Sequence, residues 1–562
     1  MSPIDVTLLR SALLSAVCVA LALPGVARAD TTTVSTTREL ARLARKSKLS
    51  GSWVIDVPGV HTISLPKLQR VQGRLDFATR GLRAVELPAL QEVGSDLFVG
   101  CDAPPRQEWE RLGPIRPLEQ VPAPSRGFEF EPTPAPSPAS AASPSAPSGA
   151  LSLPALTRVG GGFAVCSPDL GTIDAPALTE VGTDLQLFAG SSWSRVDLSG
   201  VARVRSRVFV WLADPDLTLD LSGLTAVDGS TQLGGVGTLR ADLGALVNTA
   251  ALIITGSRAT AGDGPPAPRP SLSVPDLRLD SLERASQMIA LRTVADLGVL
   301  SLPNLTRTDR LTLHDLPGLT DVSAPTLAQV AGDVTLSALP SLSTPPLLGL
   351  TMIGGDLQIA QLPGPSLELP SIEAVSGSVT VSELRSVRVL QLPRLRTAGA
   401  VRITGAGLIE LLEFAALEEV RGPFVIEGDL EQTTGGALAV LSAPRLRVIL
   451  GDDEQGLRIA QATLSSVRLP ALERIAGPLV LVDLPDLTEL LLPRLQEVAG
   501  RALVGGAPGL TALSLPGLVR ADGLELAAMP GLARLFAPRL KTELKQSGGT
   551  RIARVEMPAS ER

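Results

Sequence analysis

The chain contains very few aromatic residues. Tyrosine is absent, and only 4 tryptophans and 10 phenylalanines occur among 562 residues. Hydrophobic residues nevertheless make up 44% of the sequence, so the core has to be built from Leu, Val, Ile and Ala. At this length the chain is either several domains or one extended repeat array, because a single globular domain is usually much shorter.

Histidine is also scarce, which limits metal binding and catalysis. The only histidines, His61 and His314, fall on widely separated repeats. They would lie roughly 43 Å apart, at about 4.8 Å per turn of a stacked repeat, and cannot share a metal ion or a catalytic triad. The net charge is only −7, and no basic stripe with interleaved aromatics occurs. We therefore expect no cofactor and no nucleic-acid partner.

Long apolar runs are confined to the N-terminus, which has the features of a signal peptide. Arg10 precedes an apolar stretch over 13–23, and Ala27-Arg28-Ala29 forms a small-x-small cleavage site. A lipid anchor through Cys18 is the competing interpretation, but the residues before Cys18 make a poor lipobox. Residues 1–29 are predicted to be removed on export, and no later segment is apolar enough to span a membrane.

The sequence is instead rich in one recurring phrase, Leu-Pro-x-Leu. Examples are Leu65-Pro66-Lys67-Leu68 and Leu515-Pro516-Gly517-Leu518. Most steps between successive phrases are 22 or 23 residues, and longer steps mark insertions. The predicted proline positions, including variants of the phrase, are Pro66, Pro88, Pro154, Pro176, Ser199, Ser222, Gly244, Pro275, Pro303, Pro325, Leu348, Pro370, Pro393, Ala415, Pro444, Pro470, Pro493, Pro516 and Pro538.

The pattern inside each repeat predicts short β-strands. Apolar residues alternate in Leu-x-Leu fashion over segments that Pro and Gly cut too short for helices. Stacking such turns buries a continuous column of leucines, for example Leu490, Leu513 and Leu535, and about nineteen turns would extend about 90 Å. We predict an all-β, parallel β-helix-like solenoid. The periodic Gly477, Gly500 and Gly523 are interpreted as corners that need positive φ.

The repeats also divide the chain into segments. Thr36-x-x-Glu39 is a capping box that opens a short helix, predicted to run to Gly51 and to cap the solenoid. Pro, Ala and Ser dominate an aperiodic insertion that we predict to be disordered, and a milder version lies at 262–270. The predicted organisation is a signal peptide (1–29), the N-terminal segment with the capping helix (30–51), the first turns (52–102), the insertion (103–150), the main solenoid (151–540) and a polar tail (541–562).

Signal removal leaves two cysteines, Cys101 and Cys166. Excising the insertion aligns the segment from Val93 to Cys101 with the segment from Val159 to Cys166, within one residue of the same register. Neighbouring parallel strands are about 4.8 Å apart, which a disulfide tolerates. We predict a disulfide across the base of the insertion; the alternative is two small buried hydrophobic residues.

The phrase from Leu484-Pro485-Asp486-Leu487 through Leu490 and Leu492 to Gly500 resembles the receptor L-domain repeat. That repeat is known from insulin and epidermal growth factor receptor ectodomains, with a related form in fungal sporulation-specific cell-wall proteins. The resemblance implies a right-handed β-helical solenoid with a short N-terminal helix. The rival is the leucine-rich-repeat horseshoe, but its Asn position falls on Leu495, and the whole sequence has only Asn248 and Asn304.

Possible chemical sites are few. The clusters Asp214, Asp216, Asp220 and Asp452-Asp453-Glu454 are interpreted as hydrated corners or loops. The competing interpretation is carbohydrate catalysis for either cluster, or a calcium site for the second. Asn304 begins a glycosylation sequon. Trp193 and Trp211, one turn apart, are the best candidates for a contact patch, and packing in the core or rim is the alternative.

These observations favour an exported, non-enzymatic repeat scaffold of the cell envelope or extracellular space that binds a protein or a glycan. No catalytic residue and no metal ligand is predicted. Two alternatives stay open, a β-helical carbohydrate-active enzyme and a purely structural spacer.

Overall fold

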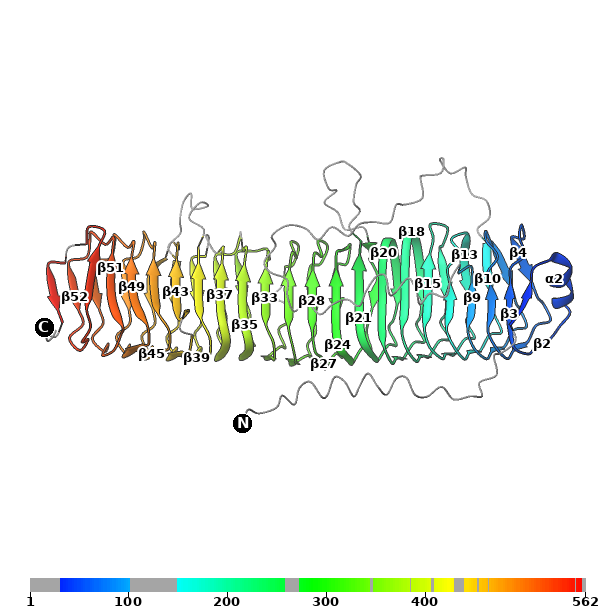
Figure 1. Cartoon of the computed structure of the whole chain (residues 1–562), viewed down its shortest axis with the longest axis horizontal. Coiled ribbons are helices and arrows are strands. Elements are labelled where there is room, and N and C mark those ends of the chain that lie inside the picture. Colours follow the sequence, from blue (N-terminus) through cyan, green and yellow to red (C-terminus); the bar gives the residue numbers. More distant parts are fainter. Residues whose placement is uncertain are drawn as a thin grey trace, which may run out of the picture.

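The computed structural model describes residues 31–101, 149–257, 272–343, 347–384, 386–405, 409–428, 439–451, 454–462, 464–550 and 552–557. They form a parallel β-solenoid of about 20 turns, each of about 22 residues, with one short helix (Figure 1). The all-β solenoid expected from the repeat is confirmed. The predicted signal peptide (1–29) and insertion (103–150) lie outside the described residues, except that Gly149 and Ala150 begin β10 (Gly149–Ser152).

Each turn contributes strands to three faces. The first, called the long face here, carries the Leu-x-Leu strands and runs the whole length of the molecule (Figure 1). Its neighbours pair in parallel, as β28 with β31 and β31 with β33 do. Its strands are β1 (Thr31–Val34), β3 (Ser52–Ile55), β6 (Leu75–Phe77), β9 (Leu97–Val99), β12 (Phe163–Val165), β15 (Leu185–Ala189), β18 (Val208–Asp220), β20 (Ser230–Asp242), β21 (Asn248–Gly256), β24 (Arg284–Arg292), β28 (Leu311–His314), β31 (Val334–Ser337), β33 (Leu357–Ala360), β35 (Ala374–Ser382), β37 (Thr397–Thr404), β40 (Phe424–Glu427), β43 (Leu457–Ala460), β46 (Leu479–Val482), β49 (Arg501–Gly505), β51 (Gly523–Ala527) and β53 (Leu544–Ser547).

The second face, called the short face, consists mostly of two-residue strands. In each of them the first residue points outward and the second, usually Val or Ile, is buried. Strands β21, β24, β35 and β37 begin on this face and continue onto the long face. The other strands are β2 (Lys48–Leu49), β5 (Arg70–Val71), β8 (Glu92–Val93), β11 (Arg158–Val159), β14 (Glu180–Val181), β17 (Arg203–Val204), β19 (Ala226–Val227), β27 (Arg307–Thr308), β30 (Gln329–Val330), β32 (Met352–Ile353), β39 (Glu419–Val420), β42 (Val448–Ile449), β45 (Arg474–Ile475) and β48 (Glu497–Val498).

The third face is continuous with the rest in the first half of the molecule and divides into separate small sheets in the second half. The ends of β18 and β20 belong to it, so these two strands span a corner. The strands on it or leading into it are β4 (Thr62–Ser64), β7 (Ala84–Glu86), β10, β13 (Leu170–Asp174), β16 (Arg195–Asp197), β22 (Leu272–Ser273), β23 (Leu277–Arg278), β25 (Val294–Ala295), β26 (Val299–Ser301), β29 (Asp321–Ser323), β34 (Ser366–Glu368), β36 (Val389–Gln391), β38 (Leu411–Glu413), β41 (Ala439–Ser442), β44 (Leu464–Arg468), β47 (Glu489–Leu491), β50 (Ala512–Ser514), β52 (Arg534–Phe536) and β54 (Arg554–Glu556).

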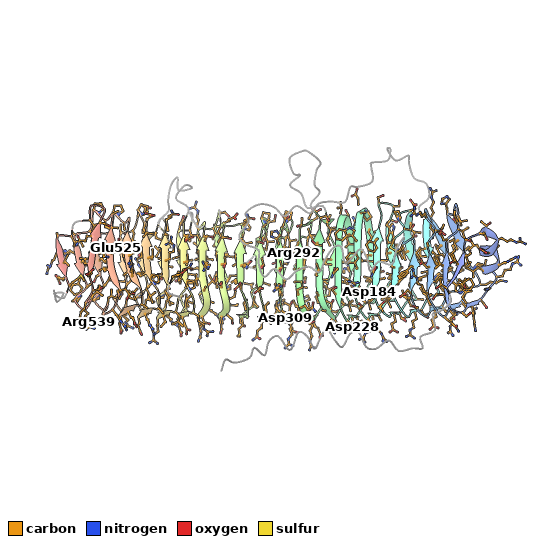
Figure 2. The ribbon with its side chains drawn as sticks, in the orientation of Figure 1. Asp184, Asp228, Arg292, Asp309, Glu525 and Arg539 are labelled. Carbon is orange, nitrogen blue, oxygen red and sulfur yellow. A yellow bond between two sulfur atoms is a disulfide. The ribbon has the colours of Figure 1, made fainter. Side chains whose placement is uncertain are left out.

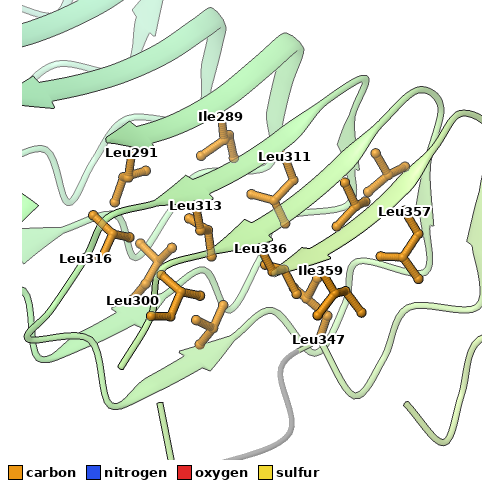
Figure 3. Packing of buried hydrophobic residues seen from close by; sticks show 14 of the residues in the cluster. Ile289, Leu291, Leu300, Leu311, Leu313, Leu316, Leu336, Leu347, Leu357 and Ile359 are labelled. Carbon is orange, nitrogen blue, oxygen red and sulfur yellow. The ribbon is translucent and has the colours of Figure 1, made fainter. Parts of the chain in front are cut away.

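The core is a stack of mostly aliphatic side chains that runs along the described turns. Figure 3 shows a few of its middle turns. Leu313, Leu336 and Ile359 are register partners on successive strands of the long face, and all are buried. On the third face the predicted column is also buried, and Leu513 is the register partner of Leu535. A single turn is too thin to bury its own apolar side chains. The stabilising burial therefore comes from contacts between neighbouring turns.

The Leu-Pro-x-Leu phrase is a β-turn between the third face and the short face. The amide of Leu68 donates to the carbonyl of Leu65 at 3.2 Å, which closes a four-residue turn with Pro66 at its second position. Proline suits this position because its φ is already that of the turn.

One predicted repeat position is wrong. The turn after Gly244 is built by Leu279 to Leu282, whose amide donates to the Leu279 carbonyl at 3.2 Å, while β23 pairs with the end of β20. Asp280, not Pro275, therefore occupies the proline position. The step of 36 residues from 244 to 280 contains the 14 residues of 258–271, which lie outside the described chain, and 36 − 14 leaves a normal turn of 22. Pro275 was chosen wrongly because the extra residues lengthen this step and the true corner residue, Asp280, is not a proline.

The glycine prediction is also wrong, since Gly477, Gly500 and Gly523 do not have positive φ. At Gly500 a Cβ would instead lie 3.1 Å from the Pro478 nitrogen of the adjoining turn. The positive φ values recur directly after the strands of the long face, where non-glycine residues such as Ala338 (φ 53°) alternate with glycines such as Gly506 (φ 63°).

The two ends of the stack are closed differently. At the N-terminus α2 (Thr37–Leu43) packs Leu43 onto the core, and the predicted capping box of Thr36 and Glu39 is present. The helix ends at Leu43 instead of the predicted Gly51, because β2 already pairs with β5. At the C-terminus, β53 and β54 continue the stack into the segment expected to be a polar tail. Among the described residues no helix is long and apolar enough to cross a membrane.

Candidate binding strip on the long face

The predicted disulfide is present. Cys101 and Cys166 are joined with their Cα atoms 5.0 Å apart. Val99 and Val165 are register partners, so the two cysteines are offset by one residue. Gly100 lies between Val99 and Cys101 with a φ of +69°, and this bend brings the Cys101 sulfur to its partner despite the offset.

Trp193 is not a contact residue, which corrects half of the predicted patch. Its side chain is 2% exposed, and its Nε1 donates to the Ser167 carbonyl at 2.9 Å. The Trp193 amide donates to the Gly190 carbonyl at 3.0 Å, so Trp193 closes a corner turn at a position where other turns carry an inward leucine. The indole therefore fills the core.

Trp211 does lie on the outer surface of the long face. It follows Val210 and precedes Leu212, both buried, so its own side chain points outward from β18 and is half-buried. The Phe209 ring is parallel to the indole, with centroids 6.2 Å apart, and Phe188 of β15 lies 5.5 Å from Phe209. Neither phenylalanine was predicted as a surface residue, although the Leu-x-Leu alternation places both on the outward register.

Register pairing places Trp211 in a straight row of outward residues, which we call the strip. Trp211 pairs with Phe188 on one side and Gly234 on the other, and the row continues turn by turn along β21, β24, β28 and β31. Seven residues at about 4.8 Å per step span about 29 Å along the solenoid axis. The members of the strip are Phe188, Trp211, Gly234, Thr255, Arg292, His314 and Ser337.

Gly234 allows the indole to lean along the sheet. A Cβ built on Gly234 would be 2.9 Å from Cζ3 of Trp211 and 2.9 Å from the carbonyl oxygen of Thr255. Any side chain at this position would displace the indole or the neighbouring strand. The indole can adopt this position only because the residue beside it on the next turn is glycine.

The cationic part of the strip begins three strands after Trp211. Arg292 is half-buried on β24, and no hydrogen bond or ion pair joins its guanidinium group to another described side chain. Burial, together with the charge of Arg310, lowers the pKa of Arg292. Arg310 is itself paired with Asp333 at 3.1 Å, and Nδ1 of His314 lies 2.7 Å from the Ser337 hydroxyl. Figure 2 shows Arg292 over the middle of the long face.

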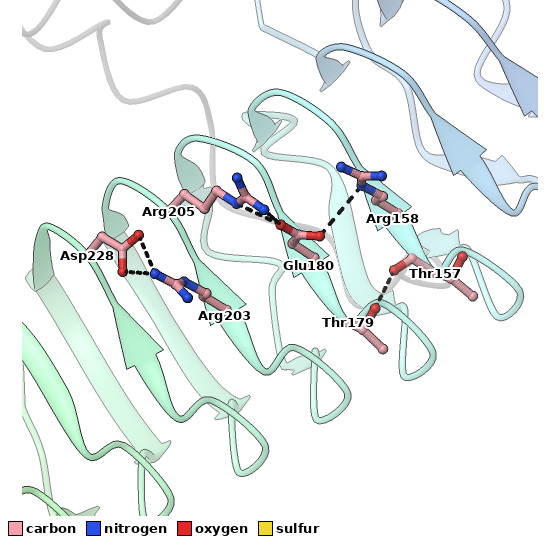
Figure 4. Close-up of polar contacts among 7 residues, drawn as sticks. All are labelled: Thr157, Arg158, Thr179, Glu180, Arg203, Arg205 and Asp228. Carbon is pink, nitrogen blue, oxygen red and sulfur yellow. Dashed lines mark hydrogen bonds and ion pairs between the residues drawn. The ribbon is translucent and has the colours of Figure 1, made fainter.

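On part of the short face, by contrast, charged side chains of neighbouring turns are paired with one another (Figure 4). Glu180 lies between Arg158, at 3.6 Å, and Arg205, at 2.6 Å, and Arg203 binds Asp228 at 2.8 Å. Pairs this exposed contribute little to stability. They do place an opposite charge beside each of these side chains.

The acidic cluster at Asp214, Asp216 and Asp220 has structural roles. Asp214 is a corner residue with a φ of 65°, and Asp216 pairs with Arg240. The carboxylate of Asp220 accepts the Ser222 amide at 3.0 Å. In the other predicted cluster, Asp452 and Asp453 lie outside the described residues. Within the described part of the chain, no group of three or more His, Cys, Asp or Glu is arranged to hold a metal ion.

The two histidines are far apart, as expected. His61 Nδ1 lies 2.7 Å from the Gly81 carbonyl near the N-terminal end, whereas His314 belongs to the strip. Asn304, which begins the sequon, uses its side-chain amide to donate to the Asp280 carbonyl at 2.7 Å.

Comparison with known proteins adds no family assignment: no family model, curated protein or solved structure matches the chain.

Proposed function

We propose that the chain is an exported, non-enzymatic scaffold of the cell envelope or extracellular space, which presents its long face to a partner. The observation that carries the proposal is the strip, where aromatic and cationic side chains share one straight row on a rigid sheet. Residues held on strands keep their geometry better than residues on loops.

Two features support export. The sequence begins with a segment typical of signal peptides. The bond between Cys101 and Cys166 also fits an oxidising compartment, because cytosolic proteins keep their thiols reduced.

A carbohydrate-active enzyme is the second candidate, and one observation favours it. A depression of about 360 Å³ on the third face is lined by the carboxylates of Asp220, Asp242 and Asp276, together with Arg240 and Arg278. One oxygen of Asp220 and one of Asp242, on neighbouring strands, each accept a backbone amide two residues further on, at 3.0 Å and 2.9 Å. Both groups thus have a structural role that a catalytic carboxylate does not need.

Two measurements test the proposal. Fractionation of the native cells should find the chain outside the cytoplasm, with its N-terminus near Asp30. Incubation of the purified mature protein with acidic and neutral polysaccharides should release no new reducing ends or unsaturated uronates. Retention in the cytoplasm, or saturable turnover that is lost in an Asp220→Asn, Asp242→Asn double variant, would overturn it. A pure spacer would show neither turnover nor binding on the long face.

A further inference from the structure

We propose that the strip binds an anionic polysaccharide, with the polymer lying along the solenoid axis and its acidic groups on Arg292. This inference deepens the proposed function, because it names the class of ligand for the same face.

The shape of the strip suits an extended polymer. It is a single row of outward-facing residues, one per turn, on an uninterrupted sheet. The two depressions on the third face and near the C-terminal end of the described chain are lined by other residues. A compact small molecule needs a concave pocket that buries most of its surface, whereas this row lies along the outer face of a sheet. A linear chain can instead contact successive turns, because one sugar residue is about as long as one strand spacing.

The aromatic end of the strip provides a platform for a sugar ring. The Trp211 indole leans over Gly234, next to the parallel ring of Phe209. Aromatic rings offer a broad apolar face with little conformational entropy to lose, and the C–H groups of a pyranose can pack on such a face. Thr255, the next member with a side chain, is half-buried and supplies a hydroxyl group.

The cationic end selects for negative charge. Arg292 is partly desolvated on a sheet face without a carboxylate partner among the described residues, and Arg310, directly before β28, acts on it with a charge of the same sign. None of the seven strip residues is acidic, and the carboxylate of Asp333 is paired with Arg310. A carboxylate or sulfate group bound at Arg292 would make charge-assisted hydrogen bonds that the isolated chain lacks.

A protein partner fits the strip less well. A stable protein interface buries about 800 Å² per partner around a cluster of large side chains. On the strip, Gly234 and Thr255 separate Trp211 from Arg292, so the two anchors are about 14 Å apart with little bulk between them.

The experiment measures binding of the purified mature protein, by calorimetry, to three probes. These are polygalacturonate as a carboxylate polymer, dextran sulfate as a sulfate polymer and dextran as their neutral counterpart. We expect binding to at least one anionic polymer and none to dextran. The two anionic arms show which acidic group is preferred, and added salt should weaken the affinity because the contact is ionic.

Variants locate the site. Arg292→Gln and Trp211→Ala should each weaken binding about tenfold or more, the loss expected for one anchoring contact. The matched control is Arg494→Gln, an exposed arginine away from the strip, which should bind like the parent. Unchanged melting curves show that each variant is folded.

Equal binding by Arg292→Gln and the parent, binding to dextran as tight as to the anionic polymers, or no binding to any of the three would overturn the inference. Failure of the proposed function is recognised separately, because cytoplasmic retention or polymer cleavage contradicts the scaffold whether or not Arg292 contributes to binding.

Discussion

At the corner between the third face and the short face, the residue at the proline position determines whether a backbone amide needs a hydrogen-bond acceptor. Where the corner is Pro, there is no amide to satisfy. In three successive turns the proline position is instead Ser199, Ser222 or Gly244, and each amide is accepted by an aspartate two residues earlier, at 3.2, 3.0 and 2.9 Å. Proline removes the corner amide, whereas an aspartate two residues before Ser or Gly accepts a hydrogen bond from it. Both arrangements avoid a corner amide without a partner.

A double-mutant cycle tests this equivalence. Asp220→Ala should lower the free energy of unfolding by about 1 kcal/mol, because it leaves the Ser222 amide without its acceptor. In a Ser222→Pro background the same change should cost almost nothing, since no amide remains. Urea midpoints of the four proteins give the coupling energy. Additive effects would show that Asp220 stabilises the corner in some other way.

The pKa of Asp197 gives a pH dependence. Burial pushes the pKa of this carboxyl upward, but hydrogen bonds from Ser199 and Arg195 outweigh burial and hold the pKa below its usual value. The stabilisation is therefore complete above the unfolded-state pKa of about 3.9 and is lost as the pH falls through the lower folded-state value. The stability difference between the parent and Asp197→Ala should shrink between pH 5 and pH 2. A difference that does not change over this range would contradict the assignment.

Substitutions at two corner residues with positive φ, Ala338 and Gly506, should change the stability of the fold in opposite directions. Ala338→Gly should stabilise the fold by up to about 1 kcal/mol, because the left-handed conformation is unfavourable for a residue with a Cβ. Gly506→Ala should destabilise it, since the new Cβ would lie 2.9 Å from the Asp483 nitrogen. Thermal melting of both variants measures the effect. Destabilisation by Ala338→Gly would mean that the corner is not strained.

Some single residues could be placed from the sequence, and others could not. The Cys101–Cys166 pair could be predicted because excising the insertion aligns two turns. Trp193 could not be placed, because the alternation that assigns strand residues to a face does not extend through a corner. Arg292 was missed because a lone arginine carries no motif, and its row becomes visible only when 258–271 is excised and the strands are set in register.

Elements were easier to predict, because every turn repeats the same apolar spacing. Strands were expected wherever Leu-x-Leu recurs, and the buried columns confirm this. The helix was placed correctly by its capping box, but its end was not, since pairing of Lys48 and Leu49 with the next turn overrides local helical preference. Likewise, the hydrophilic residues after 540 form strands because they add to an existing sheet edge.

The disulfide should matter most to the turns that flank the insertion. The bond links residues 65 apart in sequence, so a Cys101→Ser, Cys166→Ser double variant should lose about 2–4 kcal/mol of stability, largely through a less restricted unfolded chain. Amide exchange should accelerate in β9 to β13 and stay unchanged in β46 to β51. Titration of the denatured mature parent should find no free thiol; two free thiols would contradict the bond.

The whole molecule is a rod, because each turn adds one strand spacing in a single direction. Small-angle scattering should give a skewed distance distribution with a maximum dimension of roughly 100 Å, about nineteen steps of 4.8 Å plus the ends. A symmetrical distribution typical of a globule would rule out a continuous stack. The length could be predicted from the repeat count. Which side of the rod carries the binding strip could not, because that depends on register across many turns.

The distribution of basic residues along the rod gives its two ends a separate chemistry. The chain has only five lysines, Lys46, Lys48, Lys67, Lys541 and Lys545, which all lie in the first or last turns, whereas the sides carry arginine. Lysine at the ends discourages pairing of the open strand edges with other chains. It also places every side-chain amine at the tips. Any amine-directed coupling, natural or experimental, would therefore hold the rod by its ends and leave its three faces unmodified.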